Sequence, residues 1–433
     1  MFATLLRSFL SPRSPDRIHA LQRRWSAIPE SLRVADQMIG SYVWGCAATH
    51  GVHERCNFGC TACYLGSRAN QQKPMPFEEI REQIDTMRRH MGPGGNIQIT
   101  SGEVTLLPVE DLVRILSYAR TRQLVPMVMT HGDVVLHDPA YLDRLVTEGG
   151  LTKISIHVDI TQRGRKGVAR TDSERELNGI RDRMAAMLRD CRKRTGRKLK
   201  AATTLTINRR NLAQLDHVVT WFLDNLDAFR ILSLQPQAQT GRTHDDGGVT
   251  GGMVWRRLEE ILGTRLDAHP FKFGHPDCTW LTLILAMELG RRRILLQAVR
   301  PDNRAEHRLV AELFRHLGGV DLNDQPLSVT IAKVAGLLLR HPLLLARVAA
   351  CAVARSWDER RHIPAVIWAA LRGRLRLRAM AFVVHNFMSG AELDTAVGRE
   401  RLAACSFKVP LHGEMVSMCR MNATDLRETT YKV

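Results

Sequence analysis

The sequence predicts an α/β protein whose main part is a partial (β/α)6 TIM-like barrel. Between about residues 40 and 242, six short apolar or β-branched runs alternate with amphipathic stretches, which is typical of parallel strands connected by helices. A Gly- and Asp-rich breaker at 245–252 ends this pattern, and six units fall short of the eight of a closed barrel. The expected strands are 42–48, 96–100, 125–130, 153–159, 201–207 and 229–235, and the expected helices between them are 76–90, 109–122, 138–147, 175–195 and 211–226.

The 433 residues divide into four predicted parts. A basic N-terminal extension at 1–39 precedes the core barrel at 40–245. A mainly helical C-terminal region follows at 246–400. The tail at 401–433 contains two cysteines around Gly413, and this pattern predicts a small hairpin that holds two thiols near each other.

The charge balance favours an anionic partner. Lys and Arg number 62 against 44 Asp and Glu, a net charge of +18. Nucleic acid is the weaker candidate, because the basic run at 192–200 has no interleaved aromatic residues for base stacking. Acidic lipid headgroups at a membrane surface are the other candidate.

One apolar segment, 327–354, has Lys333, Arg340 and Arg347 at intervals of seven, so that these cations share one helix face. Pro342 predicts two helices instead of one. Such helices suit a membrane interface, but they equally suit a pair of helices that covers the core. No uncharged stretch reaches the length of a membrane span, and nine sparse cysteines indicate a reducing compartment. We therefore expect a cytoplasmic protein, with peripheral membrane attachment as the variant.

Three cysteines follow the first expected strand within eight residues. Cys56, Cys60 and Cys63 have the spacing C-x₃-C-x₂-C. Zinc sites usually complete four protein ligands, whereas three thiolates on one loop suit three corners of a [4Fe–4S] cluster. The fourth iron would then be free to bind a small molecule.

This loop, placed after the first strand of a six-unit βα pattern, resembles the radical S-adenosylmethionine (radical SAM) superfamily over about residues 40–242. The resemblance implies a cluster that cleaves S-adenosylmethionine reductively to a 5′-deoxyadenosyl radical. It also implies an electron donor of the flavodoxin or ferredoxin kind. In much of the superfamily an aromatic residue precedes the last cysteine, where this chain has Ala62. Tyr64 is the candidate that compensates for it.

Ser101, Gly102 and Glu103 end the second expected strand and look like the superfamily's Gly-Gly-Glu-Pro motif, with Ser101 and Val104 as departures. The carboxylate could pair with the cofactor's ammonium, and glycine permits close backbone approach. Later strand ends contribute further candidates for cofactor contact, because ligands bind at that edge of such folds. They are Thr130, Ser155, His157, Thr206 and Asn208.

Cys405 and Cys419 in the tail resemble the cysteine element of SPASM or twitch domains, which hold auxiliary clusters. Cys278 offers a third thiol and His275 a fourth ligand. Together they could bind a second iron–sulfur cluster or a single zinc or iron ion. The tail also has a weaker resemblance to the tetraether lipid synthase-like branch.

We therefore predict a radical SAM enzyme that abstracts hydrogen from an unactivated C–H bond, with a lipid as the candidate substrate. The alternatives are a peptide or small-protein maturase with an auxiliary cluster and, less favoured, an RNA-modifying protein. No catalytic residue is assigned from the sequence.

Overall fold

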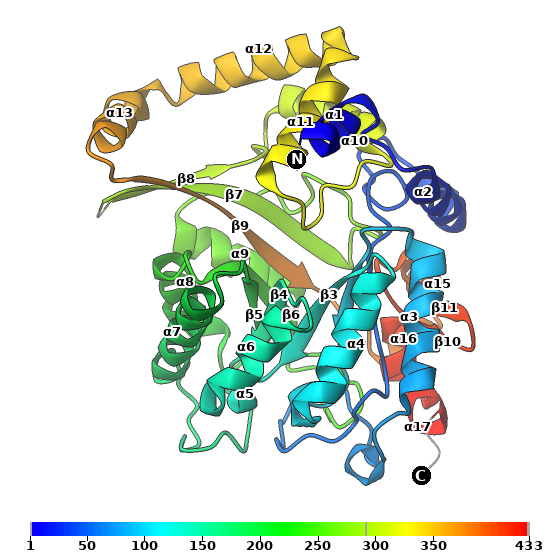
Figure 1. The fold of residues 1–433 in the computed structure, drawn as a ribbon. Coiled ribbons are helices and arrows are strands. Elements are labelled where there is room, and N and C mark those ends of the chain that lie inside the picture. Colours follow the sequence, from blue (N-terminus) through cyan, green and yellow to red (C-terminus); the bar gives the residue numbers. More distant parts are fainter. Residues whose placement is uncertain (1, 291, 431–433) are drawn as a thin grey trace.

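One continuous 11-stranded sheet runs through the centre of the fold. The computed structural model describes residues 2–290 and 292–430. The strand order is β11-β10-β1-β2-β3-β4-β5-β6-β9-β7-β8 (Figure 1). The middle of this sheet is the predicted partial barrel, and strands from the C-terminal half extend it on both sides.

The six barrel strands are parallel and lie in chain order, which confirms the predicted (β/α)6 pattern. Helices cover the outside of the curved sheet (Figure 1). The strands are β1 (Cys46–Ala48), β2 (Asn96–Ile99), β3 (Val125–Thr130), β4 (Lys153–His157), β5 (Lys200–Ile207) and β6 (Phe229–Pro236). The helices are α3 (Phe77–Met91), α4 (Val109–Thr121), α5 (Asp133–His137), α6 (Pro139–Thr147), α7 (Asn178–Thr195) and α8 (Leu215–Asp224).

Burial of apolar faces holds the helices on the barrel. In α4 the residues Leu112, Leu116 and Ala119 follow the helical period and are fully buried. They belong to the main core together with strand residues such as Ile97 and Val128. The first strand is shorter than predicted because Gly45, with φ of 119°, turns the chain immediately before it.

The region at 246–400 contains, beside its helices, strands that the sequence pattern did not predict. Three strands, β7 (Thr279–Leu289), β8 (Arg292–Gln297) and β9 (Leu375–His385), continue the sheet beyond β6. β9 runs parallel to β6 and antiparallel to β7. In β7, Ile284 and Ala286 are buried in the core, but Leu283 and Leu285 on the other face are also apolar. Apolar residues on both faces remove the alternation that reveals a strand.

The predicted tail hairpin is present and extends the sheet on the side of β1. β10 (Phe407–Leu411) and β11 (Glu414–Ser417) are antiparallel, and Gly413 turns between them with φ of 81°. β10 runs parallel to β1. The helices around the hairpin are α14 (Gly390–Leu393), α15 (Ala396–Ala404), α16 (Met418–Ala423) and α17 (Leu426–Thr430).

Three helices form what we call the arm: α11 (Leu327–Leu339), α12 (Pro342–Asp358) and α13 (Ile363–Leu371). The predicted division at Pro342 is confirmed. Among the described residues no single helix is long and apolar enough to cross a bilayer, although α11 and α12 pass that test as a pair bent by 112°. In Figure 1, α12 and α13 reach out over β7–β9. The remaining helices are α1 (Phe2–Leu10), α2 (Pro15–Ala27), α9 (Gly251–Leu262) and α10 (Arg304–Leu317), with short 3-10 turns at Glu30–Leu32, Ala69–Gln71, Val104–Leu106, Leu212–Gln214 and Arg360–His362.

Candidate functional site

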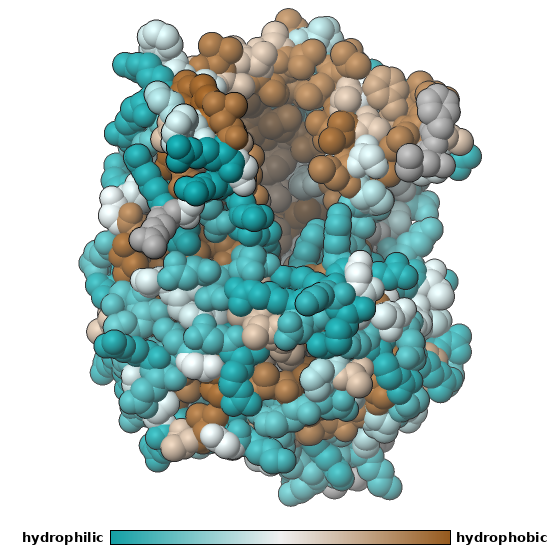
Figure 2. All heavy atoms as spheres, turned by 60° about the vertical axis from the view of Figure 1, so that its left-hand side comes forward, coloured by the Kyte–Doolittle hydropathy of each residue, from teal (hydrophilic) through white to brown (hydrophobic). Residues whose placement is uncertain are grey.

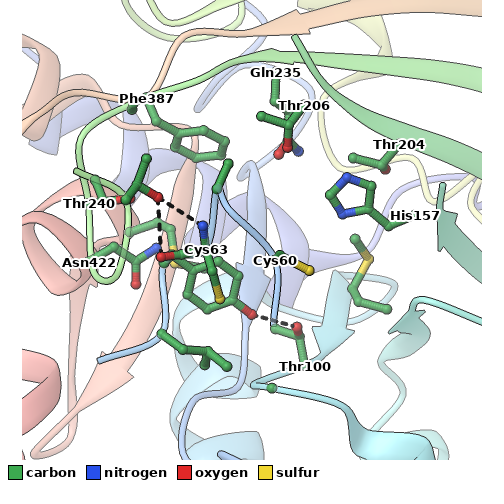
Figure 3. A pocket seen from close by; sticks show the side chains of 18 of the residues that line it. Cys60, Cys63, Thr100, His157, Thr204, Thr206, Gln235, Thr240, Phe387 and Asn422 are labelled. Atoms are coloured by element: carbon green, nitrogen blue, oxygen red, sulfur yellow. Dashed lines mark hydrogen bonds between the residues drawn. The ribbon is translucent and has the colours of Figure 1, made fainter. Parts of the chain in front are cut away.

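The cysteine loop after β1 is fixed by backbone hydrogen bonds to other segments. The N–H of Cys56 donates to Asn70 Oδ1 at 2.9 Å, and the N–H of Cys63 donates to Thr243 Oγ1 at 2.8 Å. Between them, the N–H of Gly59 donates to the carbonyl of Arg163 at 2.9 Å. All three predicted cysteines line one cavity. Figure 3 shows two of them, Cys60 and Cys63.

The environment of these thiols fits a cationic cluster. Burial raises the pKa of Cys56 to about 12. The pKa of Cys60 is also raised, mainly by burial and to a smaller extent by the charge of Cys63. Positively charged iron would be needed to hold such buried sulfurs as thiolates. Among the described residues, no group of three or more His, Cys, Asp or Glu side chains could hold one metal ion. A cubane fits better, because it spaces its ligand sulfurs more widely than a single ion does.

Gly102 and Glu103 brace the cysteine loop. The N–H of Gly102 donates to the carbonyl of His53 at 3.0 Å, and the N–H of Glu103 donates to the carbonyl of Arg55 at 2.9 Å. A Cβ on Gly102 would stand 2.5 Å from the carbonyl oxygen of Glu54, so only glycine fits this approach. The structure thus joins the cysteine motif to the second predicted motif.

The Glu103 carboxylate is held in one orientation although its side chain is buried. It accepts hydrogen bonds from Thr105 Oγ1 at 2.6 Å, from Thr130 Oγ1 at 2.8 Å and from the backbone N–H of His131 at 2.8 Å. The His131 ring stacks on Phe58 of the cysteine loop with ring centroids 3.7 Å apart. Glu103 and Thr130 both line the cavity, so the carboxylate is fixed beside the three cysteines.

Polar side chains from β4 and β5 form the opposite wall. His157 Nε2 is hydrogen-bonded to Asp159 Oδ2, and this carboxylate also accepts from the N–H of Thr206 at 2.6 Å. Burial favours a raised pKa for Asp159, but the charge and hydrogen bond of His157 and further donors lower it. Ser155 Oγ lies 3.0 Å from Thr204 Oγ1. The labelled side chains of this wall face the cysteines in Figure 3.

Tyr64 lies immediately after the last cysteine and is fixed by the second motif. Its hydroxyl donates to the carbonyl of Ser101 and lies 3.3 Å from Thr100 Oγ1. Burial raises the pKa of Tyr64 to about 12. The Arg427 guanidinium covers the ring at 4.9 Å and pairs with Glu54 at 2.7 Å. A residue from the C-terminal helix therefore closes the cysteine loop.

Eight of the nine residues predicted to contact a cofactor line the cavity. The exception is Asn208, whose side chain instead donates to Gln237 Oε1 at 3.0 Å and accepts from the N–H of Arg210 at 3.0 Å. Sequence reasoning missed several lining residues, and the positions of the first two at strand ends could have revealed those two. They are Thr100, Met129, Thr204, Gln162, Phe387, Met388, Phe407, Met418 and Asn422.

The tail cysteines lie near one another in the structure. Burial and then the charge of Cys405 raise the pKa of Cys278 to about 11 and also raise the pKa of Cys419. Arg401 Nε donates to Cys278 Sγ at 3.5 Å, and Cys419 lines the same cavity as the first three cysteines. The ring of His275, the predicted fourth ligand, lies 3.7 Å from the carboxylate of Glu400. Among the described residues no group of three or more His, Cys, Asp or Glu side chains is arranged here to hold a metal ion, and the auxiliary metal site stays a prediction.

These features define a partial barrel in which one cavity is lined by three cysteines that suit an iron–sulfur cluster and by a buried carboxylate beside them. Residues 52–217 match the family model of the Radical SAM superfamily, so this part of the chain is a radical SAM domain. The match implies a [4Fe–4S] cluster and S-adenosylmethionine as the cofactors of this part of the chain, and an enzyme.

The chain is also similar to individual proteins. It is 25% identical over 335 residues to 7,8-dihydro-6-hydroxymethylpterin dimethyltransferase of Methanocaldococcus jannaschii, and the match covers 66% of this chain and 64% of the relative. It is similar to SuiB of Streptococcus suis bound to S-adenosylmethionine, with 13% identity, 50% of this chain and 46% of that chain covered, and a TM-score of 0.38. It is also similar to methylornithine synthase (PylB), with 18% identity, 60% of this chain and 73% of that chain covered, and a TM-score of 0.36. The chain thus matches less than two thirds of the length of the first two.

Proposed function

We propose that the protein is a radical SAM enzyme that cleaves S-adenosylmethionine reductively and abstracts hydrogen from an unactivated C–H bond. The observation that carries this proposal is the common cavity of Cys56, Cys60 and Cys63 with the Gly102–Glu103 motif. When bound, the cluster and S-adenosylmethionine supply a 5′-deoxyadenosyl radical.

The residues of the chain have separate roles in this proposal. The three cysteines hold the cluster, and Glu103 accepts hydrogen bonds from the ammonium of S-adenosylmethionine. The hydroxyl and imidazole groups of Ser155, His157 and Thr206 hold its polar ribose. Tyr64 and Phe58 exclude water from the cysteine loop, since both rings are packed against neighbouring side chains.

A lipid chain is the substrate class that the surroundings of the cavity favour. Ile231, Ser233 and Gln235 share one face of β6, because side chains alternate along a strand. Gln235 lines the cavity, whereas Ile231 is 39% exposed and lies beside Ala381, which pairs with Leu283. The face therefore leads over about 13 Å from the cavity to an apolar sheet surface.

Figure 2 shows where this surface opens. The part of the molecule to which the arm, α1 and β7–β9 contribute is hollowed and lined mainly by hydrophobic side chains. Leu283 and Leu285 of β7 are 40% and 36% exposed, and Leu377 of β9 is 58% exposed. A hydrocarbon chain in this hollow would point one end toward the cavity, which is the arrangement that attack on an unactivated C–H bond needs.

A second iron–sulfur cluster at Cys278, Cys405 and Cys419 is part of the proposal. The support is that three thiols from separate segments lie near one another, so that the charge of Cys405 adds to burial in raising the pKa of Cys278 and of Cys419. Such a cluster would also suit the alternative function, maturation of a peptide or small protein. A flavodoxin- or ferredoxin-like electron donor and a cytoplasmic location with peripheral membrane attachment complete the proposal.

Methyl transfer is a second candidate reaction, favoured by the similarity to a pterin dimethyltransferase. The two candidates differ in the fate of the S-adenosylmethionine methyl group. With a trideuteromethyl donor, methyl transfer adds the label to the product, whereas simple hydrogen abstraction does not.

The test is anaerobic reconstitution followed by incubation with S-adenosylmethionine, dithionite as the electron source, and vesicles of phosphatidylglycerol with perdeuterated acyl chains. We expect 5′-deoxyadenosine that contains deuterium, and a variant with Cys56, Cys60 and Cys63 all changed to Ala should form none. Deoxyadenosine without deuterium would reject the lipid substrate and leave the radical SAM reaction. No deoxyadenosine from iron-loaded protein would reject both.

A further inference from the structure

The arm leaves an extensive apolar surface without a partner inside the molecule. In α12, a helix of 17 residues, Leu344 is the one buried residue, and in α13 it is Ala369. The described residues include nineteen exposed large hydrophobic side chains, and twelve of them lie between Leu327 and Leu377. Exposure of this extent over one segment marks a binding surface.

The same surface has the side chains that anchor proteins at a bilayer interface. Trp357 and Trp368 are 68% and 57% exposed. The Arg360 guanidinium covers the Trp357 ring at 5.0 Å, and the Arg372 guanidinium covers the Trp368 ring at 4.0 Å. An amphipathic ring next to a cation suits the boundary between acyl chains and headgroups.

The charges of the segment select anionic lipids. From residue 326 to residue 378 the sequence has ten Lys or Arg and two acidic residues. Some of these cations are already used, as in the pairs of Arg347 with Glu312 and Arg378 with Glu288. Five exposed arginines have no ion pair within the described residues: Arg360, Arg361, Arg372, Arg374 and Arg376.

The base of the arm, α11, is held against α1. α1 packs against α11 so closely that a Cβ on Gly336 would stand 2.3 Å from the carbonyl oxygen of Phe9. Arg340 reaches across and donates to the carbonyls of Phe9 and Leu10 at 2.9 and 3.0 Å. Leu6 and Leu10 on α1 are exposed and add to the apolar surface.

We propose that the arm docks on a bilayer that contains anionic lipids, with the five arginines at headgroup level. The apolar side chains of α12 and α13 enter the interface, and the hollow of Figure 2 then opens toward the acyl chains. This inference deepens the proposed function, because it names the route by which a lipid substrate would arrive. Docking itself requires no chemistry at the cluster.

Vesicle flotation of the reconstituted full chain tests the proposal. We expect the wild type to float with vesicles of phosphatidylglycerol and phosphatidylcholine, and at least tenfold less with phosphatidylcholine alone. The variant W357E/W368E should lose at least nine tenths of the bound fraction. The variant in which the five arginines are changed to Gln should lose binding and its salt dependence. Val397→Glu is the matched control, because Val397 is 51% exposed outside the arm and should float like the wild type.

Folding and function are measured separately. Deoxyadenosine formation without added substrate should be the same in W357E/W368E and the wild type, which shows that the variant is folded and its cluster is intact. Bromolipid quenching of tryptophan fluorescence should be stronger in the wild type than in W357F/W368F. Flotation that is absent in the wild type, or unchanged in the variants, overturns the proposal. So does a lipid-free dimer that W357E/W368E dissociates, because the arm would then bind a second copy of the chain.

Discussion

The α-carbon of Gly102 lies against the carbonyl of Glu54, so that a Cβ at position 102 would stand 2.5 Å from that oxygen. The contact fixes the start of the cysteine loop against the end of β2. Gly102→Ala should displace the loop, at an expected cost of about 1–3 kcal/mol in the free energy of unfolding. We expect iron content and deoxyadenosine formation to fall together. Gly59→Ala is the control in the same loop, because nothing lies within 4 Å of its Cβ position, and equal losses in both variants would contradict the argument.

Removing the charge of Glu103 should weaken binding of S-adenosylmethionine without removing the cluster. Glu103→Gln keeps the shape of the side chain, and a hydrogen bond to a charged group contributes about 1.5–3 kcal/mol. The expected result is roughly ten- to hundredfold weaker binding in equilibrium dialysis, at unchanged iron per chain. Glu110→Gln, at an exposed position paired with Arg144, is the control. Wild-type affinity in Glu103→Gln would show that the carboxylate only braces the loop through Thr105 and Thr130.

The iron content of a variant tests whether Cys278 and Cys419 hold a second cluster. If Cys278 and Cys419 are ligands, the variant C278S/C419S should contain about four fewer iron and sulfide ions per chain than the wild type. The signal of the first cluster in electron paramagnetic resonance should remain. Cys191→Ser serves as the control, since this cysteine is buried between helices far along the chain from both motifs. Equal iron in the variant and the wild type would mean that the tail thiols bind no cluster.

The buried His50 should make stability depend on pH. Burial lowers its pKa from 6.5 to about 4. Between these values the unfolded chain takes up a proton and the folded chain does not, so the free energy of unfolding falls as the pH drops from 6.5 to 4. A shift of this size corresponds to about 3 kcal/mol. His50→Gln should remove this part of the pH dependence in urea titrations, whereas His244→Gln, at an exposed position, should retain it. Parallel curves for His50→Gln and the wild type would exclude His50 as the cause.

The barrel and the first cluster site were predictable because local signals coincide there. The strands that contain Ile97, Val128 and Ile154 each bury an apolar face and are separated by clear helical periods. The motif around Cys56 is contiguous in sequence. The strands β7–β9 were missed because β7 is apolar on both faces. The alternation Leu375-Arg-Leu-Arg378 at the start of β9 was the available signal.

Contacts between segments that lie far apart in the chain could not be predicted from the sequence. Arg427 covers Tyr64 and pairs with Glu54 from more than 360 positions away, and no spacing rule reveals such a pair. Likewise, Phe387 and Met418 reach the cavity from the C-terminal segments. The fold brings them together only because β9 and β10 extend opposite sides of the sheet.

The last prediction concerns the path of the substrate along the face of β6 that carries Ile231 and Gln235. Ile231 lies at the hollow end of that face and Gln235 at the cavity end. Ile231→Trp should fill the path with a larger ring and keep a lipid chain from reaching the cavity. We expect at least tenfold less transfer of deuterium from perdeuterated phosphatidylglycerol to 5′-deoxyadenosine, while deoxyadenosine formation without substrate stays at the wild-type level. Val397→Trp places the same ring at an exposed site elsewhere and should change neither quantity. Undiminished deuterium transfer in Ile231→Trp would show that the substrate enters by another route, and a parallel loss of uncoupled deoxyadenosine would show that the barrel itself was disturbed.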